Sequence, residues 1–430
     1  MRRLLSFILC FFSTVFLFSF PSYSGEGNPV VVATVRGVIN PVAGQYISKA
    51  IESAGRKKAA ALVIELDTPG GLDTSMREIV KAILGSRVPV VVYVAPGGAM
   101  AASAGVFIAM ASHVAAMSPG TAIGAAHPVS VTEKMDKVMA EKATNDAAAY
   151  ARSLAEKRGR NGQWAEDAVR KSISATETEA LGKGIVDLLA PDLKTLLKEI
   201  HGRRVVTAGG EQLLDTAGAR IIREEMGIRD RLLDLISDPN VAYVLMLLGF
   251  YGLFFELTSP GAVFPGVVGA VSLILAFYSF QTIPVNYAGL LLIITGIILF
   301  ILEVKVTSYG MLTIGGIASL VMGSLMLFDS PAPFLRLSLA VIIPAAVVTA
   351  LFFGVTIRLA YRAFKRRPVT GIEGLAGLEG KAHTEITPEG GTVFVHGEFW
   401  SAFSDSPLPR GAGVVVTEVR GMRLKVDHIT

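Results

Sequence analysis

Hydrophobic and polar positions alternate with two periods in the first half of the chain. Between Pro29 and about Leu197, short apolar runs typical of buried strands alternate with segments whose apolar residues recur at helical spacing. Parallel strands joined by crossover helices bury both faces of a sheet, so this alternation predicts a mostly parallel α/β domain over residues 29–200. The predicted strands are Val30–Val35, Ala60–Leu66, Pro89–Ala95 and His113–Met117, and the predicted helices are Val42–Ala54, Thr74–Leu84, Ala101–Ala111 and Met139–Arg158.

Five apolar stretches follow, and most are long enough to cross a hydrocarbon core of about 30 Å. They predict a helical membrane region over residues 241–360. Residues 201–240 are expected to link the two regions, with a hairpin-like stretch at 203–211 and an amphipathic helix at Ile221–Ile236. The stretches are Val241–Leu257, Gly261–Phe280, Tyr287–Val304, Met311–Phe328 and Leu337–Ile357.

The last region, residues 368–430, returns to short strands separated by Gly, Pro and Asp turns. Five such strands in this length are typical of a small all-β, OB-like barrel. OB-like barrels often bind nucleic acid, but this one shows one tryptophan, Trp400, few clustered cations and no aromatic platform. We therefore expect a protein-binding or assembly role, with no nucleic acid. The strands are expected at Gly380–Glu385, Thr392–His396, Glu398–Ala402, Gly413–Glu418 and Met422–Val426.

The N-terminus has the pattern of a secretory signal peptide over residues 1–24. Arg2 and Arg3 precede an apolar run from Leu4 to Phe20, and small residues suit cleavage near Ser24; a retained signal anchor is the alternative. The single cysteine of the sequence lies inside this segment, so disulfides and thiolate chemistry are excluded for the mature chain. The six histidines are scattered without ligand spacing. We therefore expect neither a metal nor another cofactor.

Composition and charge placement point to a multi-pass membrane protein, and the membrane is expected to be the bacterial inner membrane. The chain of 430 residues is 51% apolar with a net charge of +4, which is too apolar for an ordinary soluble protein. Basic residues at 362–367 follow the fifth apolar stretch closely and place that end in the cytoplasm. An odd number of spans then places the α/β domain on the extracytoplasmic, periplasmic side and the C-terminal barrel in the cytoplasm.

Candidate chemistry lies at the carboxyl edge of the predicted sheet. Gly97-Gly98 breaks the third strand, and Ser103 then falls near the first turn of a helix, where backbone N–H groups lack intrahelical partners. A serine placed there suits a nucleophile whose oxyanion meets main-chain donors; the alternative is a small residue in tight packing. The turn after the second strand carries Gly70-Gly71 at the same edge, which suits an oxyanion hole or a cradle for an extended peptide.

A serine nucleophile needs a proton acceptor, and two residues qualify. His127 would form the familiar Ser–His pair with Ser103. The number of residues between them allows the chain to come back to the same edge of the sheet. Lys142 lies near the start of the next helix, and a buried lysine there has a pKa lowered by desolvation. From these residues alone His127 is the safer choice, and both remain open. Residues 131–139, before that helix, suit a mobile loop.

Several of these motifs together resemble the long-form NfeD family, membrane-bound Clp-class serine proteases associated with stomatins. The resemblance covers the whole mature chain. It implies a crotonase-like (Clp/signal-peptide-peptidase-like) α/β fold and a Ser–Lys dyad, with Ser103 as nucleophile and Lys142, in preference to His127, as base. It also implies oxyanion donors at the backbone N–H groups of Gly71 and Ala104, and stomatin- or flotillin-like partners. The motifs are Gly70-Gly71, Met100-Ala-Ala-Ser103-Ala-Gly105, Lys142-Ala-Thr-Asn145, Tyr150-Ala-Arg-Ser-Leu-Ala-Glu and Gly159-Arg160-Asn161.

The sequence therefore favours a membrane-anchored serine endopeptidase that cleaves apolar segments of membrane-associated, stomatin-like proteins. An extended peptide substrate is expected beside the Gly70-Gly71 turn, and membrane lipid around the helical region. A homodimer or higher homo-oligomer is expected. The alternative is a non-catalytic membrane scaffold in which Ser103 only packs. A crotonase-type acyl-thioester enzyme is disfavoured, because the domain is expected to be exported from the cytoplasm that supplies coenzyme A.

Overall fold

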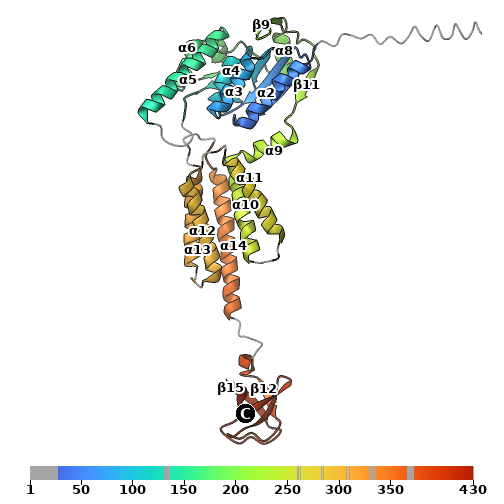
Figure 1. The fold of residues 1–430 in the computed structure, drawn as a ribbon, viewed down its shortest axis with the longest axis vertical. Coiled ribbons are helices and arrows are strands. Elements are labelled where there is room, and N and C mark those ends of the chain that lie inside the picture. The colour runs from blue at the N-terminus through green and yellow to red at the C-terminus, as the bar shows by residue number, and fades with distance from the viewer. Residues whose placement is uncertain are drawn as a thin grey trace, which may run out of the picture. The chain divides into compact units, whose positions relative to one another are not determined.

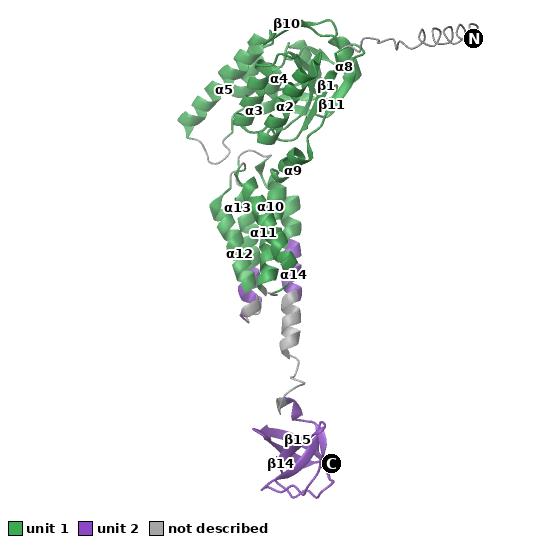
Figure 2. Cartoon of the chain, turned by 45° about the vertical axis from the view of Figure 1, so that its right-hand side comes forward, with its two compact units in different colours: residues 1–301, 315–346 green, residues 302–314, 347–430 purple. Residues whose placement is uncertain are grey.

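The computed structural model describes residues 28–129, 136–258, 263–281, 285–306, 310–328, 335–365 and 372–429, with the single residues 261, 283, 308 and 330 between them. The predicted signal peptide and most of the predicted 131–139 loop lie outside these residues. Two compact units divide the chain (Figure 2). One comprises residues 1–301 and 315–346, and the other residues 302–314 and 347–430.

A six-stranded parallel sheet forms the centre of the α/β domain (Figure 1), which confirms that prediction. Val31, Ala33 and Val35 on one strand pack into the core of one sheet face, and Val30 and Val32 into the core of the other, as the period of two requires. In spatial order the strands are β11 (Ile221–Glu224), β1 (Val30–Arg36), β2 (Ala61–Asp67), β3 (Val90–Val94), β5 (Val114–Met117) and β8 (Leu188–Leu189).

Helices cover the two faces of this sheet unequally. The larger core lies under the long helices, and the smaller core lies under one short helix and a hairpin. On the first side lie α2 (Pro41–Arg56), α3 (Asp73–Leu84), α4 (Ala104–Ala111), α5 (Lys137–Lys157), α6 (Gly162–Arg170) and α7 (Glu177–Gly182), and on the second α8 (Leu193–Glu199) with β9 (Arg204–Thr207) and β10 (Gly210–Leu213).

A small second sheet aligns the turns at the carboxyl edge. It consists of β4 (Met100–Ala102), β6 (Ala122–Gly124) and β7 (Ser174–Thr176). The Thr68 N–H donates to the Met100 carbonyl at 2.7 Å, and the Ala102 N–H donates to the Thr68 carbonyl at 3.0 Å. The predicted helix from Ala101 was therefore wrong at its start, because these pairings hold Ala101 and Ala102 as strand.

The predicted amphipathic helix Ile221–Ile236 was wrong in its first half. Its first four residues form β11, the edge strand of the sheet, which pairs in parallel with β1. The isoleucines Ile221 and Ile222 suit such a strand, and pairing with β1 overrides the helical pattern. Gly227 then begins α9 (Ile228–Ile236).

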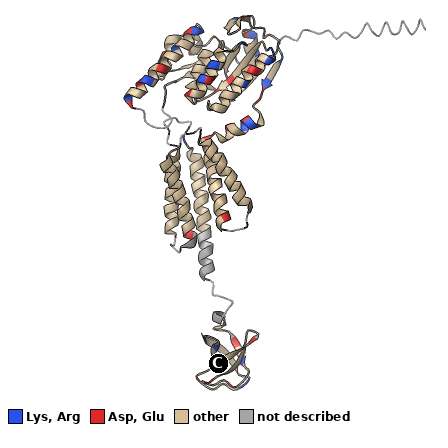
Figure 3. Cartoon of the chain, viewed as in Figure 1, with Lys and Arg blue, Asp and Glu red and all other residues tan. Residues whose placement is uncertain are grey.

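In the described part of the predicted membrane region there are five apolar helices, and the colours of Figure 3 show that α10–α13 contain few charged residues. Among the described residues, only Pro239–Leu257 is long and apolar enough by itself to cross a membrane. The apolar stretches of the other four helices have 10–17 residues each. The helices are α10 (Pro239–Thr258), α11 (Val263–Ser279), α12 (Tyr287–Lys305), α13 (Met311–Leu327) and α14 (Leu339–Lys365).

The C-terminal residues form the predicted five-stranded barrel, which is closed. The expectation that it carries no aromatic platform was wrong: His383, Phe394 and Phe399 form a cluster with ring centroids 4.8 and 4.9 Å apart. The phenylalanines are 41% and 62% exposed. Phe394 and Phe399 are direct partners across the β13–β14 pair, which brings their rings together. In order around the barrel the strands are β12 (Glu379–Ala382), β13 (Gly391–Val395), β14 (Glu398–Phe403), β16 (Arg423–His428) and β15 (Gly413–Arg420).

A buried histidine makes the stability of the α/β domain sensitive to acid. The Val90 N–H donates to Nδ1 of His113 at 3.1 Å. Burial, and then the charges of Arg158 and Arg160, lower the pKa of His113 to about 3. The unfolded chain keeps a histidine pKa near 6.5 and binds the extra proton first, so stability is lost as the pH falls below about 6.5.

Lowering the pH from about 7.5 to about 5 is therefore expected to cost about 2 kcal/mol of stability at this residue. Hydrogen exchange of the β3 and β5 amides in the full-length chain measures this loss of stability. His113→Asn is the matched variant, because its side-chain oxygen accepts the same bond from Val90 and does not titrate. If both proteins lose protection equally, His113 is not the cause.

Candidate active site

Ser103 lies at the junction of β4 and α4 in an unusual backbone conformation. It is the N-cap residue of α4, with φ 50° and ψ −111°, and its side chain is half-buried. Its backbone N–H donates to the Ala125 carbonyl at 3.0 Å. A serine with positive φ is uncommon, and such strain persists only where the surrounding structure imposes it. The position near a helix start was predicted, whereas the backbone strain was not.

A cavity of about 280 Å³ opens beside Ser103. Three helices and the segment after β6 form its walls, and most of its lining is apolar. A site of this size suits one or two side chains of a bound segment. The lining residues are Gly71, Asp73, Met76, Arg77, Ser103, Ala104, Phe107, Ala126, Pro128, Val129, Ala143, Asp146 and Ala147.

Two of the three predicted backbone positions line this cavity. Within the described residues, the N–H groups of Gly71 and Ala104 have no hydrogen-bond acceptor. The Gly70 N–H, in contrast, donates to Oγ1 of Thr68 at 3.1 Å, and the Gly70 carbonyl accepts from the Ile39 N–H. Gly70 therefore shapes the turn, with φ +129°, while Gly71 and Ala104 present free donors beside Ser103.

Neither predicted base lines the cavity. Nδ1 of His127 donates to the Val169 carbonyl at 3.0 Å. Lys142 is exposed on α5, where the next residue, Ala143, lines the cavity instead. Successive helix residues point about 100° apart, so the Lys142 side chain starts from the flank of the cavity wall. The structure thus brings Ser103, Gly71 and Ala104 together and leaves the Ser–Lys dyad a prediction.

A charged cluster at the edge of this cavity was missed from sequence. Arg77 on α3 bonds to Asp73 at 2.8 Å and to Asp146 on α5 at 2.6 Å, and it lies 4.8 Å from the Tyr150 ring centroid. Burial lowers the pKa of Arg77, but the two carboxylates outweigh it and raise the pKa above its usual value. Tyr150 also stacks on Phe107 of α4. The cluster therefore joins the three helices that form the cavity.

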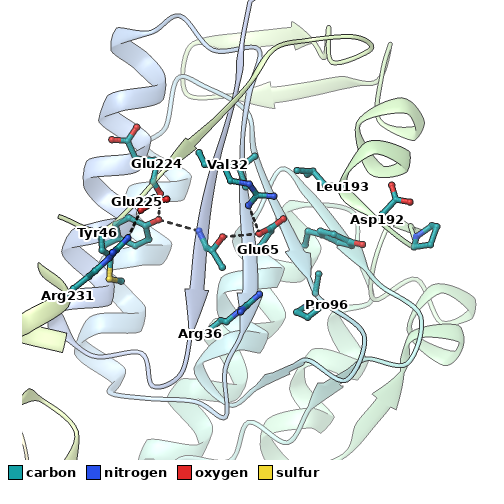
Figure 4. Close-up of a pocket in the computed structure, with 16 residues that line it drawn as sticks. Val32, Arg36, Tyr46, Glu65, Pro96, Asp192, Leu193, Glu224, Glu225 and Arg231 are labelled. Carbon is teal, nitrogen blue, oxygen red and sulfur yellow. Dashed lines mark hydrogen bonds and ion pairs between the residues drawn. The ribbon is translucent and has the colours of Figure 1, made fainter. Parts of the chain in front are cut away.

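A larger cavity, of about 630 Å³, lies where β11 ends beside β1 (Figure 4). Several of its charged groups pair with one another. The Glu65 carboxylate accepts from Oγ1 of Thr34 at 2.9 Å and from Arg223 at 3.2 Å, and Arg231 pairs with Glu225. Dashed lines in Figure 4 mark contacts at Glu65 and at Arg231. Arg223 pairs with the Glu65 carboxylate, and none of the predicted site residues lines this cavity, so we keep the Ser103 cavity as the candidate site.

Comparison with known proteins settles the family. Three family models match consecutive regions: the NfeD1b N-terminal domain at residues 29–196, the NfeD integral membrane domain at residues 240–359, and the NfeD-like C-terminal, partner-binding domain at residues 372–427. The membrane-bound protease PH1510 of Pyrococcus horikoshii is 36% identical over 412 residues, which are 93% of each chain. The chain belongs to the NfeD family.

Other NfeD relatives are similar over part or all of the chain. The membrane protein NfeD1b of Bacillus subtilis is 26% identical over 434 residues, 94% of each chain. The 1510-N membrane protease of Pyrococcus horikoshii, specific for a stomatin homologue, is 37% identical and covers 49% of this chain and 99% of its own, with a TM-score of 0.43. A lysine-to-alanine mutant of 1510-N in complex with a substrate peptide is 36% identical, covering 48% and 96%, with a TM-score of 0.45.

The family assignment confirms an integral membrane domain and a relationship to a membrane-bound protease. In the described residues, no group of three or more His, Cys, Asp or Glu side chains is arranged to hold a metal ion.

Proposed function

We propose that this NfeD protein is a serine endopeptidase in which Ser103 is the nucleophile. One observation carries the proposal: a serine with strained backbone faces an apolar cavity beside two backbone N–H groups that have no acceptor among the described residues. The Ser103 oxygen attacks the carbonyl carbon of a peptide bond, and the resulting oxyanion is bound by the N–H groups of Gly71 and Ala104. The amine leaves with a proton, and water then hydrolyses the acyl-enzyme.

Lys142 is proposed as the base that takes the Ser103 proton and returns it to the leaving amine. Its α5 neighbours Ala143 and Asp146 line the cavity, so a rotation of the lysine side chain about its flexible stem directs the amine toward Ser103. Catalytic hydrogen bonds often form only in the complex with substrate. The relative that was studied as a lysine-to-alanine mutant with bound substrate peptide supports a lysine in this role.

The proposed substrates are apolar segments of stomatin-like membrane proteins. Met76, Phe107 and Val129 give the cavity an apolar wall, and the related protease from Pyrococcus horikoshii is specific for a stomatin homologue. The proposal includes partner binding by the C-terminal barrel, which matches a partner-binding domain model. It also places the α/β domain in the periplasm and the barrel in the cytoplasm of a bacterial cell, in a homodimer or larger homo-oligomer.

Two single variants of the full-length protein test the base. Lys142→Ala is expected to lower kcat for an apolar fluorogenic peptide by at least about a hundredfold, because the serine loses its proton acceptor. His127→Ala is expected to keep kcat within about twofold, because its ring bonds to the Val169 carbonyl away from the cavity. If instead His127→Ala lowers kcat across the pH–rate profile and Lys142→Ala leaves kcat nearly unchanged, the base is His127.

A non-catalytic scaffold is the second candidate, favoured by the position of both bases outside the cavity lining. In that case the wild-type protein hydrolyses no peptide, and assembly with stomatin-like partners is unaffected by changes at Ser103 or Lys142. Turnover by the purified wild-type protein that disappears in Lys142→Ala excludes this candidate.

A further inference from the structure

Helix α9 leaves an apolar stripe open to solvent. Ile228, Leu232 and Leu235 are 89%, 53% and 56% exposed. Their spacing of four and three residues places them on one face of the helix, within about 60° of arc. Isolated exposed leucines are common, but three aligned on a helix of nine residues form a continuous surface.

The opposite face of α9 is fixed to the α/β domain. Asp230 pairs with Lys49 of α2 at 2.9 Å, and Asp234 accepts a hydrogen bond from Nδ2 of Asn40 at 2.8 Å. These two carboxylates lie about 130–170° around the helix from the centre of the apolar stripe. Ile228 and Leu232 therefore point away from the α/β domain, whereas Leu235, at the end of the stripe, also lines a cavity with Val38 and Leu72 of that domain.

The end of α9 adjoins the membrane domain. The carbonyl of Ile236 accepts a hydrogen bond from Oγ of Ser279, the last residue of α11. The first apolar membrane helix, α10, begins three residues later at Pro239, and the integral membrane domain model matches from residue 240. The chain thus enters the bilayer within one helical turn of Leu235.

We propose that α9 lies in the lipid headgroup layer and inserts its apolar stripe, Ile228, Leu232 and Leu235, at the boundary with the acyl chains. Arg229, which is exposed and makes no ion pair among the described residues, flanks the stripe and suits a lipid phosphate. An apolar face beside a cation, next to a membrane entry point, has the pattern of an interfacial anchor. This contact holds the α/β domain at the bilayer surface and does not depend on any activity of Ser103.

Spin labels on the full-length chain test the contact. Leu232→Cys is labelled with a nitroxide, with Cys10→Ser in the background, in nanodiscs of phosphatidylethanolamine and phosphatidylglycerol. Apolar oxygen partitions into lipid and a water-soluble nickel chelate does not. The ratio of oxygen to nickel accessibility is expected to be several-fold higher at Leu232→Cys than at Glu52→Cys, an exposed position on α2.

Each outcome decides the proposal. Equal ratios at the two positions mean that the stripe faces water, and the proposal fails. Low accessibility to both reagents, with dipolar broadening between labels, means that a second copy covers the stripe, and the lipid contact is also overturned. If Leu232→Cys does not fold, Ile228→Cys at the first turn of the same stripe gives the same comparison.

Discussion

Replacement of Ser103 by alanine is expected to abolish peptide cleavage and to leave the fold intact. Loss of a serine nucleophile lowers kcat by on the order of a thousandfold or more, since the backbone donors alone retain only weak catalysis. In the described residues the Ser103 hydroxyl has no hydrogen bond, whereas its backbone N–H donates to the Ala125 carbonyl and its backbone carbonyl accepts from the Val106 N–H. Removal of the hydroxyl therefore leaves no buried partner unsatisfied, and the stability change is expected to stay within about 0.5 kcal/mol.

Ser112, at the other end of α4, is the matched control. Its hydroxyl donates to the Ala109 carbonyl at 2.7 Å and lies 3.0 Å from the Val114 carbonyl in a buried site. Ser112→Ala is expected to lower stability by about 1–3 kcal/mol and to leave kcat nearly unchanged. The measurements are turnover of an apolar fluorogenic peptide in nanodiscs and hydrogen exchange of α4. Full turnover by Ser103→Ala contradicts the proposed nucleophile.

Gly71→Ala is expected to damage both activity and packing. A Cβ added at Gly71 lies 2.2 Å from the Ile39 carbonyl oxygen, so backbone has to move. The displaced segment carries the proposed oxyanion donor, and loss of one such donor costs about a hundredfold to a thousandfold in kcat. Overpacking of this kind also costs about 1–3 kcal/mol of stability.

Gly55→Ala separates this effect from a general effect of a methyl group. Gly55 lies in α2 with nothing within 4 Å of an added Cβ. Alanine there is expected to raise stability by about 0.5–1 kcal/mol without changing kcat. Separate kcat and KM values for both variants decide the role of Gly71. If kcat of Gly71→Ala is unchanged while stability falls, the glycine serves packing alone.

The parallel sheet, the apolar helices and the barrel followed from periodicity because burial dictates those patterns locally. The strand β11 did not, because Ile221–Glu224 becomes a strand only through pairing with β1, which lies far away in the sequence. In a short segment with a mixed hydrophobic pattern, pairing with a distant strand decides the secondary structure, and the local sequence does not reveal that pairing.

The site, too, was predictable only where local sequence determines the position of a residue. Gly71 and Ser103 lie in the segments that follow the buried strands β2 and β3, so chain order alone brings them to one edge of the sheet. The bond between Arg77 and Asp146 joins positions 69 residues apart and has no local signal. The i,i+4 spacing of Asp73 and Arg77 was readable, but it is equally common on solvated helix faces. The side-chain positions of Lys142 and His127 depend on packing that the sequence pattern does not express.

The barrel at the C-terminus has one further consequence. Each of its strands is hydrogen-bonded on both sides, since β12 pairs with β15 as well as with β13. Proteins tethered in a bilayer reach high local concentrations. At such concentrations, edge strands with unpaired backbone groups pair with neighbouring molecules and cause aggregation. A closed barrel has no unpaired strand edges, so neighbouring copies cannot join through strand pairing even at high local concentration. Recognition by this domain then depends on its outward side chains, such as Phe399, and on its loops.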